Sequence, residues 1–128
     1  AMWGLYDVGV GLGDTDALAA FHEAIDALAA NLTRWDLGYW SRYDLFPHPI
    51  PNPASSFYHD LHIKQLQVTN RLAPRSEIAR VAERWAGYGA SALDRRRAFA
   101  HKALFRVIVP RNRLLSRRLP WSSMRVGV

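Results

Sequence analysis

The sequence predicts a mainly α-helical protein, organised as part of an (α/α) toroid with a long aromatic and proline-rich loop. Three observations support this prediction. Apolar residues recur at helical spacing, turn and capping residues interrupt that spacing, and an aromatic and proline-rich stretch divides it. Antiparallel helix pairs joined by such a loop match part of a toroid, in which inner helices line a cleft and outer helices cover them.

The clearest helix is expected over residues 14–32. Its apolar side chains fall three and four residues apart and therefore share one helical face: they are Leu18, Phe21, Ile25, Leu28 and Leu32. Residues 13–16 supply the turn and the N-cap before this helix. Residues 2–10 have the pattern of the end of another helix, in which Gly4 and Gly9 lower helix propensity but permit close packing.

Three more helices are expected after the loop. Ser55 and Ser56 cap a helix over residues 56–72, and Ser76 caps one over residues 77–88, which two glycines close. The buried stripe of that second helix consists of Ile78, Val81, Ala82 and Trp85. A last helix is expected from residue 94 to residue 109, where Pro110 stops it.

The loop over residues 35–54 contains the aromatic side chains Trp35, Tyr39, Trp40 and Tyr43, followed by a proline at every second position from 47 to 53. Alternate prolines exclude a helix and favour an extended backbone. Loops of about 20 residues in compact domains are often functional, although a simple spacer is the alternative.

The charge is distributed unevenly along the chain. Residues 1–93 contain 7 Arg and Lys against 10 Asp and Glu, whereas residues 94–128 contain 10 Arg and Lys against Asp94 alone. We therefore divide the chain into a helical domain over residues 1–93 and a basic tail, helical or irregular, over residues 94–128. Such a tail either binds polyanions or an acidic membrane surface, or is simply a solvated end.

Several classes of protein are disfavoured by what the sequence lacks. The sequence contains no Cys, which excludes disulfides and a thiolate nucleophile. No apolar run approaches the length of about 18 residues that a membrane span needs, and the first residues lack the basic segment of a signal peptide. The compartment therefore stays unknown. The chain opens inside a helical pattern without an initial Met, which predicts truncation at the N-terminus, and its 15 Arg against 2 Lys are typical of a GC-rich bacterial genome.

Known catalytic motifs also find little support. His59 and His62 lie three residues apart with Asp60 between them, but without an HExxH pattern they do not predict a metal site. No nucleophile elbow surrounds a serine, and the glycines at positions 9, 11 and 13 follow no strand. On the expected helix over residues 56–72, Tyr58, His62, Gln65 and Thr69 share one stripe that suits either a cleft wall or an exposed face.

Four blocks of the sequence, in order and spacing, resemble the C-terminal part of D-glucuronyl C5-epimerases. They are WGLYD at residues 3–7, LGYWSRYDL at 37–45, FYHDLHIKQL at 57–66, and Glu83-Arg84-Trp85 with Tyr88. The resemblance covers about residues 2–88, and residues 94–128 match nothing in it. The Tyr-Asp and Tyr-His blocks together are fairly specific for this family, whereas either block alone would be weak evidence for it.

The resemblance implies an α/α toroid that converts D-glucuronate to L-iduronate in heparosan-like chains by removing and returning the C5 proton. It places the catalytic tyrosines at Tyr43 and Tyr58 and implies no metal or other cofactor. We expect Arg42, His48, His59, His62 and Gln65 to bind substrate. Vertebrate members have a basic residue shortly after Tyr-Asp-Leu, where this chain has Phe46-Pro47-His48, so Arg42 or His48 is expected to replace it.

Inversion needs an acid and a base on opposite faces of the sugar ring, and we expect the two tyrosines on opposite sides of one cleft. The expected partners are an acidic polysaccharide and either the remainder of the epimerase fold or a second copy of the chain, but not nucleic acid. The family also uses an acidic residue and a tyrosine upstream of this chain. Two other functions stay open: a non-catalytic glycan-binding or scaffold remnant, and a uronate polysaccharide lyase.

Overall fold

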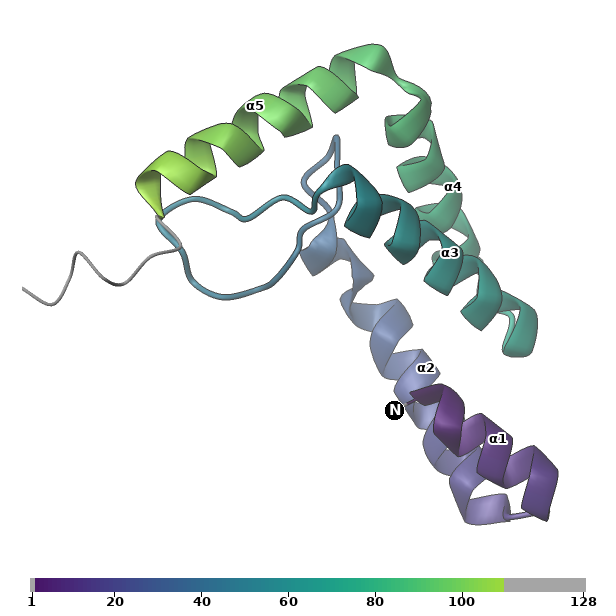
Figure 1. Ribbon diagram of the computed structural model, residues 1–128. Coiled ribbons are helices and arrows are strands. Elements are labelled where there is room, and N and C mark those ends of the chain that lie inside the picture. The colour runs from purple at the N-terminus through teal and green to yellow at the C-terminus, as the bar shows by residue number, and fades with distance from the viewer. Residues whose placement is uncertain (1, 110–128) are drawn as a thin grey trace, which may run out of the picture.

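The computed structural model describes residues 2–109, which form a mainly α-helical structure (Figure 1). The prediction of a mainly α fold is therefore confirmed. The helices are α1 (Met2–Leu12), α2 (Thr15–Asn31), the 3-10 helix η1 (Leu32–Trp35), α3 (Ser56–Leu72), α4 (Ser76–Ala90) and α5 (Ala92–Ile108). Within these residues there is no strand, only two isolated β-bridges in the loop between η1 and α3.

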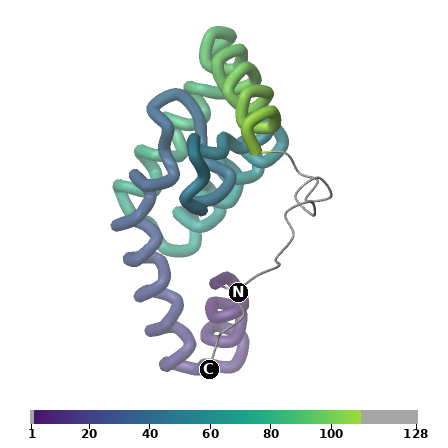
Figure 2. Tube along the Cα trace, turned by 90° about the vertical axis from the view of Figure 1, so that its left-hand side faces the viewer, coloured from purple at the N-terminus to yellow at the C-terminus, as the bar shows by residue number. Residues whose placement is uncertain are grey.

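The helices form two antiparallel pairs and one crossing helix. Helices α1 and α2 lie side by side, as do α3 and α4, and η1 continues the line of α2 into the long loop (Figure 1). Helix α5 turns away from the end of α4 and passes over that loop (Figures 1 and 2). The helices of residues 2–109 do not close into a ring, so membership of a toroid stays a prediction.

Of the three predicted N-caps, two are confirmed by hydrogen bonds. The Asp14 carboxylate accepts from the backbone N–H groups of residues 16 and 17, and the Ser55 hydroxyl accepts from that of Tyr58. The prediction for Ser76 was wrong, because Ser76 is already helical and its hydroxyl donates to Glu77 instead. Helix α4 also continues through the two glycines that were expected to close it and ends at Ala90.

The main core lies where α2, α3 and α4 meet. The predicted stripe of α4 is fully buried there, and Phe21 and Ile25 of α2 have no exposed surface. The close packing predicted at Gly9 is also present, because a Cβ atom on Gly9 would lie 2.5 Å from Leu18 Cγ, whereas nothing lies within 4 Å of one on Gly4. The absence of a side chain at Gly9 therefore lets α1 approach α2 closely at this point.

A second, smaller core joins the loop to α5. It contains Tyr39, Trp40 and Ala54 from the loop together with Ala98 from α5. The Trp40 indole N–H donates to the Ala54 carbonyl at 3.0 Å, which draws the two ends of the loop together. Helix α5, most of which lies in the predicted basic tail, is therefore packed on the loop.

The remaining sequence predictions about the basic end fall partly outside the described residues. Most of α5 lies in the predicted tail, and residues 110–128, which contain much of its charge, are outside the described range. Among residues 2–109 no helix is long and apolar enough to cross a membrane.

Candidate functional site

A cleft of about 410 Å³ opens between the loop, the first turn of α3 and the last turns of α5. We call it the tyrosine cleft; its walls include Tyr43, Asp44, His48, Tyr58, Lys102 and Arg106. Both tyrosines expected to be catalytic therefore line one cavity. They are also partly open to solvent, with 44% of Tyr43 and 39% of Tyr58 exposed, so a ligand can reach them.

The two tyrosine rings are in contact with each other. Their centroids lie 5.0 Å apart and their planes are inclined by 75°, an edge-to-face arrangement. A sugar ring held between two side chains would separate them by about 7 Å, twice the usual contact distance of about 3.5 Å between carbon atoms. The expectation that they lie on opposite sides of a cleft was wrong in this structure, because the loop places Tyr43 directly against the start of α3.

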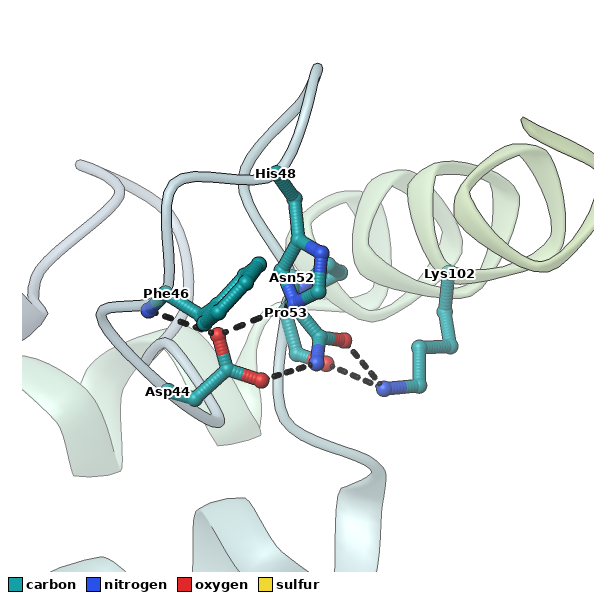
Figure 3. Close-up of polar contacts among 6 residues, drawn as sticks. All are labelled: Asp44, Phe46, His48, Asn52, Pro53 and Lys102. Carbon is teal, nitrogen blue, oxygen red and sulfur yellow. Dashed lines mark hydrogen bonds and ion pairs between the residues drawn. The ribbon is translucent and has the colours of Figure 1, made fainter. Parts of the chain in front are cut away.

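The loop that carries Tyr43 is held by the side chain of Asp44, the next residue (Figure 3). The Asp44 carboxylate accepts from the backbone N–H of Phe46 at 3.1 Å and from the Asn52 amide at 2.6 Å. His48 Nε2 lies 3.4 Å from the same carboxylate. Asp44 is thus occupied by interactions within the loop, and its place next to Tyr43 serves to fix the shape of the cleft wall.

Lys102 of α5 fastens the other end of that loop (Figure 3). Its ammonium group donates to the Asn52 side-chain oxygen at 2.7 Å and to the Pro53 carbonyl at 2.8 Å. The ammonium also lies 5.3 Å from the centroid of the Tyr43 ring. Burial, and then repulsion by Arg106, lower the pKa of Lys102. The sequence prediction missed both Lys102 and Asn52, which join three segments of the cleft.

His59 was expected to bind substrate, but its side chain is completely buried. Its Nε2 lies 3.0 Å from the Trp85 carbonyl, so it must carry the proton and donate, which leaves Nδ1 to accept from the Ser41 backbone N–H and hydroxyl. Burial lowers the pKa of His59 and favours this neutral form. In this structure His59 has no surface for a ligand, and it positions the helix that carries Tyr58.

The same hydrogen bonds determine the tautomer of His62. Because the Ser41 hydroxyl donates to His59, it can only accept from His62, whose Nδ1 lies 3.1 Å away. His62 Nδ1 therefore carries the proton, and Nε2 is left as an acceptor with no hydrogen-bond partner among residues 2–109. Burial has the largest effect on the pKa of His62 and lowers it, and the electrostatic effect of the neighbouring His59 lowers it further.

His62 and Gln65 line a second cavity, of about 360 Å³, further along α3. We call it the tryptophan cavity; its walls include Trp3, Trp35, Trp85, His62, Gln65 and Thr69. The Thr69 hydroxyl accepts from the Trp3 indole N–H at 3.2 Å and is almost fully buried. The polar stripe predicted on α3 is thus divided, with Tyr58 in the tyrosine cleft and the other three residues in the tryptophan cavity.

Arg42 lines neither cavity, although it directly precedes Tyr43. Its Nε atom is buried without a hydrogen-bond partner in the described part of the chain. The backbone of Arg42 forms a β-bridge with Pro53, and neighbouring residues in an extended segment point to opposite sides. Of the two residues proposed to replace the missing basic residue after Tyr-Asp-Leu, only His48 lies in the tyrosine cleft.

Comparison with known protein families identifies the family of this chain. Residues 1–87 match the family described as D-glucuronyl C5-epimerase C-terminus. The chain belongs to this family. Comparison with curated proteins and with solved structures gave no match. Both tyrosines of the cleft, and the loop and helix that carry them, lie inside the matched region of this epimerase-family chain.

The epimerase match ends before α5 begins, so the cleft is built from two unequal parts. Helix α5 adds Lys102, Phe105 and Arg106 to a wall that the matched residues leave open. A signal for this contact is present in the sequence, since Ala98, Lys102 and Phe105 share one helical face. Its partner could not be predicted, because the loop beneath has no regular periodicity.

No cluster of three metal-ligating His, Asp or Glu side chains occurs among residues 2–109. The polar groups of the tyrosine cleft are instead two phenols, a carboxylate, a hydroxyl, an amide, an imidazole and two cations. Such groups can bind an anion and exchange protons with it.

Proposed function

We propose that this epimerase-family chain takes part in inverting C5 of D-glucuronate to L-iduronate within a heparosan-like acidic polysaccharide. One observation carries the proposal: the tyrosines of the Tyr-Asp and Tyr-His blocks, 15 residues apart in sequence, meet in one accessible cleft. Tyrosines that only packed the core would be buried, whereas these two are each more than a third exposed.

The reaction proposed for the cleft is a proton transfer at a carbon next to a carboxylate. The C5 proton leaves to a base, and the electron pair moves toward the carboxylate to give an enediolate. A proton then returns to C5 from the opposite face, and the electron pair moves back to form the C–H bond. A tyrosine can remove the proton as phenolate or return it as phenol, and positioned cations stabilise the enediolate.

The contact between the two rings limits what the pair can do alone. Both tyrosines belong to one wall, so we assign them to one face of the sugar ring. The group on the opposite face is then supplied by the remainder of the epimerase fold or by a second copy of the chain. The sequence expectation of an acidic residue and a tyrosine upstream fits the first of these sources.

The test is exchange of the C5 hydrogen of a glucuronate-containing polymer with deuterium, catalysed by the native protein that carries this chain. Incorporation of deuterium together with formation of iduronate supports the proposal. Absorbance of an unsaturated uronate without iduronate would show a lyase, which shares the first step. Binding of the polymer with no exchange would show a glycan-binding remnant.

A further inference from the structure

We propose that Arg106, in the last turn of α5, binds the carboxylate of the uronate that enters the tyrosine cleft. The inference rests on the proposed function and extends it to a substrate-binding residue outside the family match, which ends at residue 87. It follows from where the cations of α5 lie and from what each of them already binds.

The tyrosine cleft is suited to an anion by its charge. Its walls hold two basic side chains, Lys102 and Arg106, against the single carboxylate of Asp44. That carboxylate is occupied by Asn52, Phe46 and His48 within the loop. The cleft therefore has a formal net charge of +1 with His48 neutral, and a uronate ring would bring the balancing charge of −1.

Most basic side chains of α5 are committed to other partners. Arg95 donates to the carbonyls of Gly89 and Ala90 at 2.8 and 3.0 Å, and the Arg97 guanidinium lies 3.9 Å from the centroid of the Tyr39 ring. Lys102 uses two of its three donors on the loop. Within residues 2–109, Arg106 has no hydrogen bond or ion pair, so all its donors are available to a ligand in the cleft.

The chemistry of the guanidinium also favours Arg106 over Lys102. A planar guanidinium forms two parallel hydrogen bonds with a carboxylate, whereas an ammonium acts as a point charge. Arg106 would thus fix the direction of the carboxylate and of the adjacent C5 atom relative to the tyrosines. Lys102 keeps the loop in place and adds positive charge, which makes it a positioning residue.

The experiment compares two probes by isothermal titration calorimetry on the native protein. One is an oligosaccharide of alternating glucuronate and N-acetylglucosamine, and the other is the same oligosaccharide with its carboxylates reduced to alcohols. Arg106→Gln should weaken binding of the first probe roughly 10-fold to 100-fold, the range for loss of a charged hydrogen-bonded contact. Binding of the reduced probe should change less than about 3-fold, and Arg106→Lys should fall between parent and Arg106→Gln for the acidic probe.

Arg96→Gln is the matched control, because it removes the same charge from an exposed position of α5 that does not line the cleft. Equal weakening by Arg96→Gln and Arg106→Gln would overturn the inference and assign the effect to net charge. Unchanged affinity of Arg106→Gln for the acidic probe would overturn it as well. Circular dichroism should show unchanged helix content, since Arg106 is exposed near a helix end.

The failure of this inference is distinguishable from failure of the proposed function. If the parent exchanges the C5 hydrogen but Arg106→Gln binds the acidic probe normally, the proton chemistry stands and the carboxylate is bound elsewhere. If the parent discriminates the two probes through Arg106 but exchanges no hydrogen, the binding residue stands and the proposed reaction is wrong.

Discussion

The imidazole of His59 lies flat against the indole of Trp40, with ring centroids 3.7 Å apart and planes inclined by only 13°. The stack joins the aromatic loop to the first turns of α3, and the hydrogen bond from His59 to the Trp85 carbonyl adds α4. One buried side chain therefore contacts the three segments that determine where Tyr43 and Tyr58 meet. The histidine of the Tyr-His block is completely buried, and it holds these segments together.

Replacement of His59 by Leu should destabilise the fold. The leucine would remove the hydrogen bonds from His59 to Ser41, whose hydroxyl keeps only His62, and to the Trp85 carbonyl, at about 0.5–1.5 kcal/mol for each lost bond. Urea unfolding followed by circular dichroism measures this loss of free energy. His22→Leu is the control, because His22 is exposed and its replacement should stay within about 0.5 kcal/mol of the parent. Equal stability of the two variants would contradict the role assigned to His59.

Stability should fall between pH 7.5 and pH 5. Burial lowers the pKa of His59, His62 and His101 in the folded protein, whereas the same groups have pKa values near 6.5 when unfolded. Below pH 6.5 the unfolded chain therefore binds more protons than the folded one, and unfolding becomes easier as pH falls. Melting temperatures across this range measure the effect. His59→Leu should show a shallower dependence than the parent.

Tyr43→Phe and Tyr58→Phe should each slow inversion, and the loss should be about 10² to 10⁴ for whichever tyrosine transfers the proton on their shared face. Phenylalanine keeps the ring and the contact between the two side chains, so folding should be little affected. The measurements are deuterium incorporation at C5 and the ratio of iduronate to glucuronate. Tyr6→Phe, which removes a hydroxyl from a ring packed against Phe21 in the core, should invert at the parent rate. Inversion by both cleft variants at that same rate would rule out these tyrosines as the proton-transfer groups.

Alanine substitutions at Gly4 and Gly9 should have opposite effects on stability. At Gly4 a Cβ atom meets nothing within 4 Å, so the gain in helix propensity should stabilise α1 by up to about 1 kcal/mol. At Gly9 it would lie 2.5 Å from Leu18 Cγ and 3.1 Å from the Leu18 backbone nitrogen, so overpacking of about 1–3 kcal/mol should exceed that gain. Thermal unfolding of the pair tests the close approach of α1 and α2, and similar shifts at both positions would argue against it.

The local features of the fold could be predicted from the sequence. Helices α2 and α4 followed from apolar spacing and α3 from its serine cap, and the caps at Asp14 and Ser55 form because their side chains bond to nearby backbone N–H groups. Both signals act within a few residues. Ser76 shows their limit, since the same residue type also fits the first turn inside a helix.

The geometry of the site could be predicted only in part. The motif pair identified Tyr43 and Tyr58, but the distance between them depends on how the loop folds back on α3, and no short-range pattern determines that. Lys102 and Arg106 were interpreted as part of a charged end, because charge alone does not show which face of a helix meets a neighbour. A buried histidine and a ligand-binding histidine also look alike in sequence, so the sequence alone could not predict that the side chain of His59 is buried.

The position of α5 has a consequence for how such a cleft can diversify. The tyrosines belong to the stretch that matches the family, while Lys102 and Arg106 lie in a helix beyond it. If the proposed function is right, substitutions at Arg106 would alter the charge that the cleft offers to a polymer and leave the two tyrosine side chains in place. Under the proposed function, changes at Arg106 would therefore act on how the polymer is held, whereas changes at Lys102 would also act on the loop that carries Tyr43.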